Sequence, residues 1–234
     1  MTARACILVF CLFWASGAAL AQDLPNAPVL RIEPGMHTAP IIDAGTDQSR
    51  DLLVTGALEN TVRIWALPEL RLVRVLRPPI VSGNEGLVGA VALTPDGKIA
   101  AVGGWPAAES GQYAVDLFDV ATGRLVRQFK ADEPVVALAF SGDGLQLAAG
   151  LSKTGVRVWQ VADGTMQEDR DFQDQVQALD FGPGRLAAAS SDGAVRLYDA
   201  TSQDAGLHPQ QRIATEAGHK ASPLEGPQSG HNLF

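Results

Sequence analysis

One pattern recurs along this chain and constrains its fold more than any other feature. Alternating apolar residues lead into an aromatic in "NTVRIWALPELRLVRVL" (60–76), "YAVDLFDVATGRLVRQF" (113–129), "TGVRVWQVADGTM" (154–166) and "GAVRLYDATS" (193–202). The aromatic anchors of these four units are Trp65, Phe118, Trp159 and Tyr198. Alternation with a period of two is typical of a half-buried β-strand. A short turn follows each aromatic, so the chain repeats a unit of strand and turn.

A second pattern precedes each of these strands. Two apolar segments rich in small residues flank a tight turn in "GAVALTPDGKIAAVGG" (89–104), "VVALAFSGDGLQLAAG" (135–150), "VQALDFGPGRLAAAS" (176–190) and, more loosely, "IIDAGTDQSRDLLVTG" (41–56). Three of these turns contain glycines, Gly97, Gly144 and Gly184, which can adopt a positive φ. The aromatic anchors lie 53, 41 and 39 residues apart, and the longest interval holds two insertions. Four strands repeated about every 40 residues predict the blades of a β-propeller.

These units resemble the tryptophan-aspartate (WD) repeats of β-propeller proteins. The turns "TPDG", "SGDG" and "GPG" and the strand ends "VRIW", "DLFD", "VRVW" and "VRLYD" carry the resemblance, which covers roughly residues 36–200. It implies an all-β propeller of about four blades at about 36–77, 78–130, 131–170 and 171–200. The arrangement also resembles exported bacterial propellers, some of which carry a caspase-like protease domain elsewhere in their chain.

The sequence departs from the family pattern in its polar residues. The family often links Asp, His, Ser or Thr and Trp within each blade, but here an acid follows the aromatic only at Asp119 and Asp199. His37 is the sole histidine before the C-terminal tail, so we expect at most one blade to complete such a network. Asp192 and Glu59 lie at suitable offsets. We therefore expect hydrophobic packing, and not polar links, to hold the blades together.

The number of blades also departs from the family. A WD propeller usually closes a ring of about seven blades of about 51° each, so four would cover only about 206° and leave an incomplete ring. Open strand edges would invite self-association. Residues 201–234 show no alternation and hold three of the four histidines, which predicts a disordered, low-structure tail. We hypothesise a reading frame interrupted after Asp199; a disordered or edge-capping tail is the alternative.

The N-terminal 21 residues have the layout of a secretory signal peptide. Arg4 precedes an apolar run from Ala5 to Trp14, and Ala19 and Ala21 are the small residues before a cut. A short buried or membrane-spanning helix is the alternative, although the run is short for a bilayer. We expect cleavage after Ala21, a linker at 22–35, and a soluble periplasmic or extracellular protein.

The remaining chemistry points away from several classes of function. Both cysteines precede the cut, which excludes disulfides from the mature chain. The formal charge of −8 argues against nucleic acid or an anionic membrane as a partner. No catalytic motif is present, and we expect no cofactor and no metal. The acidic stretch 167–174 is typical of a solvated surface.

The insertion between Gly103 and Tyr113 is the candidate interaction loop. Trp105 stands beside Pro106, and Tyr113 closes the loop. Aromatic residues dominate binding energy at protein interfaces, and loops on a rigid scaffold carry function. The alternative is that Trp105 packs back on its own blade.

The sequence therefore favours a non-catalytic scaffold that binds a protein or peptide. A hydrolase or lyase with a propeller active site is one alternative, but the predicted inner strands offer only Asp180, Ser141 and Thr94, without paired acids or a histidine. A regulatory fragment of a caspase-like protease-linked protein and a non-functional truncated product are the others. Fold alone does not identify a ligand.

Overall fold

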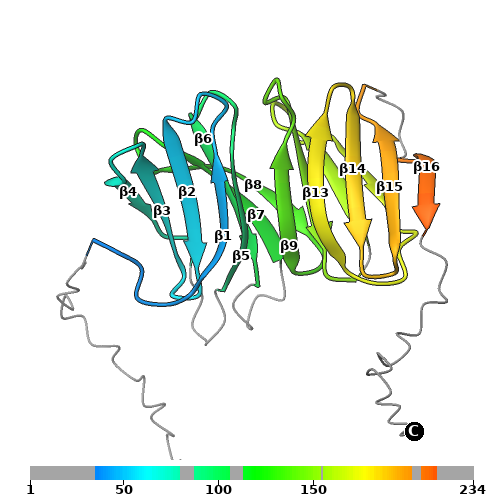
Figure 1. Cartoon of the computed structure of the whole chain (residues 1–234), viewed down its shortest axis with the longest axis horizontal. Helices are drawn as coiled ribbons and strands as arrows, with labels where there is room; N and C mark the ends of the chain where they lie inside the picture. Colours follow the sequence, from blue (N-terminus) through cyan, green and yellow to red (C-terminus); the bar gives the residue numbers. More distant parts are fainter. Residues whose placement is uncertain (1–34, 80–86, 106–112, 154, 202–206, 215–234) are drawn as a thin grey trace, which may run out of the picture. The chain divides into compact units, whose positions relative to one another are not determined.

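The computed structural model describes residues 35–79, 87–105, 113–153, 155–201 and 207–214 (Figure 1). Within these ranges the chain forms sixteen β-strands and no helix. The expected signal peptide at 1–21 and most of the linker at 22–35 lie outside the described residues.

The strands form four sheets of four. The first sheet consists of β1 (Ile41–Thr46), β2 (Leu52–Ala57), β3 (Thr61–Ala66) and β4 (Arg71–Leu76). The second consists of β5 (Val88–Leu93), β6 (Ile99–Gly104), β7 (Tyr113–Asp119) and β8 (Leu125–Ala131). The third consists of β9 (Val135–Phe140), β10 (Gln146–Leu151), β11 (Val156–Gln160) and β12 (Met166–Asp169). The fourth consists of β13 (Val176–Gly182), β14 (Arg185–Ser190), β15 (Ala194–Asp199) and β16 (Pro209–Ala214).

Each sheet is an antiparallel meander in which the strands pair in chain order (Figure 1). The aromatic anchors lie on the third strand of each sheet, and the small-residue segments form the first two strands. The predicted turn glycines Gly97, Gly144 and Gly184 have φ values of 69°, 73° and 67°. The predicted all-β fold with four blade-like sheets is confirmed, whereas the incomplete ring stays a prediction.

The fourth sheet corrects one expectation. The sequence predicted a low-structure tail from residue 201, but Pro209–Ala214 forms β16 and pairs with β15, with Val195 opposite Ile213. The tail prediction is therefore wrong for this strand. β16 is the outermost strand of its sheet, and residues 209–213 are exposed, so its sequence lacks the alternation that marks a half-buried strand.

Three apolar clusters fill the packing interfaces between consecutive sheets, which we call seams. The first seam joins Ile64 to Phe118 among other residues, the second joins Phe129 to Trp159, and the third joins Val158 to Leu186. The face of a sheet that carries the aromatic anchor packs toward the preceding sheet, and the opposite face packs toward the next one. Each inner sheet is thus buried on both faces.

Candidate interaction surface

The first aromatic anchor belongs to a polar network. Trp65 Nε1 donates a hydrogen bond of 2.8 Å to Thr55 Oγ1, and His37 Nε2 lies 2.7 Å from the same oxygen. His37 Nδ1 lies 2.8 Å from Glu59 Oε1. Burial by itself would raise the pKa of Glu59, but hydrogen bonds from Thr38, Thr61 and His37 outweigh it, so the pKa is lowered. The network predicted for at most one blade is present in the first sheet, with Glu59 as its acid.

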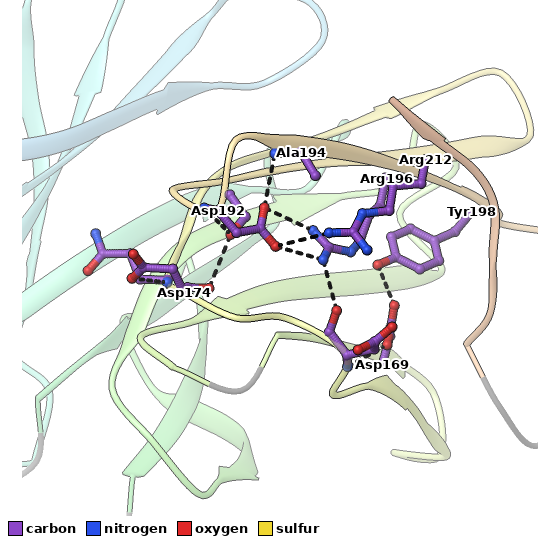
Figure 2. Close-up of polar contacts among 10 residues, drawn as sticks. Asp169, Asp174, Asp192, Ala194, Arg196, Tyr198 and Arg212 are labelled. Carbon is purple, nitrogen blue, oxygen red and sulfur yellow. Dashed lines mark hydrogen bonds and ion pairs between the residues drawn. The ribbon is translucent and has the colours of Figure 1, made fainter. Parts of the chain in front are cut away.

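The other anchors are held in different ways. Phe118 is buried in the first seam, and Trp159 stacks on Phe129 with ring centroids 5.4 Å apart and planes 4° apart. Tyr198 is also buried, and its hydroxyl donates to Asp169 Oδ2 at 2.7 Å (Figure 2). Burial, followed by this bond, raises the pKa of Tyr198. These anchors stabilise the seams and leave no reactive group exposed.

The two acids that follow aromatic anchors hold turns. Asp119 Oδ1 accepts hydrogen bonds from the backbone N–H and the hydroxyl of Thr122, at 2.7 and 2.6 Å. Asp199 Oδ1 accepts the same pair from Thr201, at 2.8 and 2.5 Å. Both carboxylates therefore shape the turn between the third and fourth strands of their sheets.

Sequence reasoning missed a set of buried charges on the third strands. The residue two positions before each anchor is Arg63, Asp116, Arg157 or Arg196, and these are 2%, 8%, 3% and 1% exposed. The expectation that hydrophobic packing alone holds the sheets is therefore wrong. The signal was present in the repeated "VR", because a charge at an inward position of an alternating strand demands a partner.

Among these buried charged residues, Arg196 has several contacts, and they link the fourth sheet to the segment that follows the third. Arg196 Nη2 lies 2.7 Å from Asp192 Oδ2 and donates to the carbonyl of Asp171 at 2.8 Å (Figure 2). The guanidinium also lies over the ring of Phe172, 3.9 Å from its centroid. The hydrogen bond from Arg196 lowers the pKa of Asp192 to about 2. The third sheet has its own version, in which Arg157 pairs with Asp132 and with Glu168.

The polar residues that a hydrolase would need are engaged elsewhere. Ser141 Oγ donates to Asp143 Oδ1 at 2.6 Å, and Thr94 Oγ1 donates to Asp96 Oδ1 at 2.8 Å, so both hydroxyls belong to turns. Asp180 is exposed on β13. Among the described residues, no group of three or more His, Cys, Asp or Glu side chains is placed to hold a metal ion. No helix within these ranges is long and apolar enough to cross a membrane.

Trp105, the main residue of the candidate loop, directly follows β6. It is 41% exposed, and its backbone N–H donates to the carbonyl of Leu87 at 2.9 Å. The indole lies over Gly89 of the same sheet, since a Cβ built on Gly89 would be 2.9 Å from Trp105 Cζ3. The side chain is thus seated on its own blade and still presents part of its ring to solvent.

The position of Trp105, directly after the second strand of its sheet, can be compared across all four sheets. The backbone N–H that follows the second strand donates to the residue before the first strand in all four sheets: Leu58 to Pro40, Trp105 to Leu87, Ser152 to Pro134 and Ser191 to Gln175. In the first two sheets this edge exposes Leu58, Leu87 and Trp105, at 39%, 37% and 41%. In the last two sheets the same positions carry Pro134 and Ser152, and Gln175 and Ser191. We call Leu58, Leu87 and Trp105 the Trp105 surface.

The other two residues of the predicted loop have different positions. Tyr113 begins β7, is half-buried and packs against the core of the second seam. Pro106 lies outside the described residues. Trp105 is therefore exposed at the surface, whereas Tyr113 is mostly part of the packed core.

Comparisons with known proteins agree with this architecture. The family model "WD domain, G-beta repeat" matches residues 123–160, from the end of the second sheet through β11. The WD repeat-containing protein VIP3 of Arabidopsis thaliana is 30% identical over 172 residues, which cover 66% of this chain and 50% of that protein. Pre-mRNA-processing factor 19 homolog 2 of the same plant is 27% identical, covering 77% of this chain and 34% of that protein. Small ribosomal subunit protein RACK1y of Oryza sativa subsp. japonica is 28% identical, covering 54% and 34%.

The fold and its seams define a protein built from propeller-type blades. The repeat match and the relatives support its assignment to the WD-repeat family. The chain spans about a third to a half of the length of these relatives. Because they come from plants, the bacterial exported type stays a prediction.

Proposed function

We propose that this chain is a non-catalytic scaffold that binds a protein or peptide through the Trp105 surface. The observation that carries the proposal is a contrast at one position: the residue after the second strand is an exposed Leu58 or Trp105 in the first two sheets and a serine in the last two. Exposed apolar groups gathered on one edge mark interaction sites. Trp105 is held by its contact with Gly89, so binding costs little side-chain entropy.

The relatives support an interaction role. One is named as a protein of the small ribosomal subunit, and another, from Scheffersomyces stipitis, as subunit I of eukaryotic translation initiation factor 3. Both names describe parts of larger assemblies. Buried Arg157 and Arg196 pair with acids at the seams, and Asp119 accepts hydrogen bonds within its own turn, which also favours binding over catalysis.

A peptide selection tests the proposal directly. A displayed random-peptide library is selected on the full chain, and each enriched peptide is then measured on Trp105→Ala and on Val126→Ala. Val126 is a matched control because it is also exposed, at 55%, on β8. We expect Trp105→Ala to weaken binding about 30-fold, as for an aromatic residue at the centre of an interface, and Val126→Ala to leave it unchanged. Peptides that bind both variants equally would overturn the proposal.

We also propose that the protein is exported, on the strength of residues 1–21. Expression of the full chain in a Gram-negative host, followed by fractionation and intact-mass measurement, tests this. We expect a periplasmic or extracellular species that begins at Gln22, and an unprocessed one for Ala21→Arg, because a small residue is required before the cut. An unprocessed wild-type chain in the cytoplasm would contradict the proposal.

A further inference from the structure

The first and second seams differ at the turns that join the first two strands of each sheet. Gln48, Pro95 and Gly142 are the second residues after β1, β5 and β9, so they occupy corresponding positions in these turns. The backbone N–H of Gln48 donates to the carbonyl of Pro95 at 3.0 Å and links the turns across the first seam. Proline has no backbone N–H, so Pro95 cannot form the same bond to Gly142 across the second seam.

A hollow of about 590 Å³ opens at this end of the second seam. Ile99 and Val161 line the hollow and also pack against the core of the second seam, so its floor is continuous with that core. Leu145 stands beside them in the turn after β9 and is 59% exposed. An exposed aliphatic side chain beside an apolar hollow is typical of an interaction site.

Two of the acids that line the hollow have basic residues close to them. Asp96 Oδ2 lies 2.8 Å from Lys98 Nζ in the same turn. Hydrogen bonds from Thr122, and then the charge of Arg74, lower the pKa of Asp119. These two carboxylates are therefore already partly neutralised by the chain itself.

The third acid, Asp143, differs from them. Its Oδ1 accepts hydrogen bonds from the Ser141 hydroxyl at 2.6 Å and from the Leu145 backbone N–H at 2.9 Å. These bonds lower the pKa of Asp143, so the carboxylate is ionised at neutral pH. Within the described part of the chain, no lysine or arginine contributes to this shift. Asp143 thus presents an exposed negative charge beside the apolar floor of the hollow.

We propose that this hollow is a second docking site, which binds a protein segment that carries an aliphatic side chain next to a lysine or arginine. The aliphatic side chain packs on Ile99, Val161 and Leu145, and the basic group binds the carboxylate of Asp143. The formal charge of −8 also favours a basic partner. This inference rests on the proposed scaffold function but uses another surface, because Ile99 begins β6 whereas Trp105 follows the end of that strand.

Titration with capped dipeptides tests the site. Backbone amide shifts of the full chain are followed by NMR as N-acetyl-leucyl-arginine amide is added. The alanyl-arginine compound lacks the aliphatic group, and the leucyl-citrulline compound lacks the charge. We expect saturable shifts at Ile99, Gly144 and Leu145 with the first compound, and about fivefold weaker binding of each of the others. Equal binding of the three compounds, or no saturable shift, would overturn the proposal.

A first pair of variants tests the apolar part of the site. Leu145→Ala should weaken binding of the leucyl-arginine compound about fivefold, because the ligand loses apolar contact. Leu70→Ala is the matched control, since Leu70 is exposed to a similar extent, 57%, in the turn before β4 and does not line the hollow. It should leave binding unchanged.

A second pair tests the charge. Asp143→Asn keeps an oxygen that accepts the hydrogen bonds of the turn but removes the negative charge, so binding should weaken about fivefold. Asp163→Asn is the control, because Asp163 Oδ1 accepts the backbone N–H of Thr165 at 2.8 Å in a similar turn outside the hollow. Binding that survives both Leu145→Ala and Asp143→Asn would place the shifts on another surface and contradict the proposal.

Two further arms define the partner and the dependence on the first surface. Cadaverine combines methylene groups with positive charge but has no peptide backbone. If it binds as tightly as the leucyl-arginine compound, the hollow is a site for small cations, and the part of the proposal that names a protein is wrong. Trp105→Ala should not alter the titration, so failure of this site and failure of the Trp105 surface are observed separately.

Discussion

A methyl group of Val135 occupies the space that a side chain on Gly103 would need. A Cβ built on Gly103 would lie 2.6 Å from Val135 Cγ1, closer than real Cβ contacts allow. The glycine lies on the second strand of one sheet, and the valine begins the first strand of the next. The same contact, with the same distance, occurs in the other two seams, at Gly56 with Val88 and at Gly150 with Val176.

Replacement of Gly103 by alanine is therefore expected to destabilise the fold. In an open position Gly→Ala would stabilise a protein by about 0.4–1 kcal/mol through the unfolded state. Here the added methyl has to displace a buried, branched side chain, which costs about 1–3 kcal/mol. Urea unfolding at neutral pH measures the difference.

The fourth sheet supplies the control for this prediction. Ala189 takes the glycine position, since it pairs with Val195 as Gly103 pairs with Val115. Ala189→Gly relieves no clash and should cost no more than about 1 kcal/mol, the usual penalty of glycine in a strand. A neutral or stabilising Gly103→Ala would show that the seam has more room than this contact implies.

Removal of the hydroxyl at the centre of the first-sheet network should also lower stability. Thr55 Oγ1 accepts the Trp65 indole N–H and contacts His37 Nε2, and Thr55 is buried. Thr55→Val keeps the shape of the side chain but leaves buried polar atoms unpaired, at a cost of about 1–3 kcal/mol. Thr46→Val, at an exposed position of β1, should change the unfolding free energy by less than about 0.5 kcal/mol. Equal effects of the two changes would contradict a structural role for the network.

The pair of Asp192 and Arg196 predicts a loss of stability in acid. The folded pKa of Asp192, about 2, lies below its ordinary value of 3.8, mainly because Arg196 binds the carboxylate. The stabilisation is therefore present above about pH 4 and is lost as the pH falls toward 2, and its size is about 2 kcal/mol. Urea unfolding of the wild type and Asp192→Asn from pH 6 to pH 2 measures it. We expect the two curves to converge at the acid end; a constant offset would argue against this ionisation as the cause.

The sequence was sufficient for the third strands and for the turns. Trp65, Phe118, Trp159 and Tyr198 all mark third strands, as the alternating pattern predicted, although β3, β7 and β11 are buried on both faces. The strand β16 was missed because an outer strand with exposed residues carries no such pattern.

The partners of the buried arginines could not be derived from local sequence. Arg157 pairs with Asp132 from the segment before β9, and Arg196 reaches the carbonyl of Asp171 from the segment after β12. Those contacts depend on how one sheet packs on the next. The same holds for Trp105, whose exposure was predictable from its loop, whereas its contact with Gly89 depends on the pairing of β5 with β6.

Asp116 gives the last prediction, because it places an acid where the other three sheets have a buried arginine. Burial raises the pKa of Asp116, and a hydrogen bond of 2.8 Å from Gln128 Nε2 offsets only part of this. A carboxyl group whose pKa is raised by folding destabilises the folded state at any pH where the unfolded chain ionises it. Asp116→Asn keeps an acceptor for Gln128 and removes the buried charge, so it should raise the unfolding free energy at pH 7. The gain should disappear below about pH 4, where Asp116 is protonated in both states. Asp180→Asn, on an exposed position of β13, should have no effect at either pH, and a loss of stability in Asp116→Asn at pH 7 would show that the ionised carboxylate has a favourable partner.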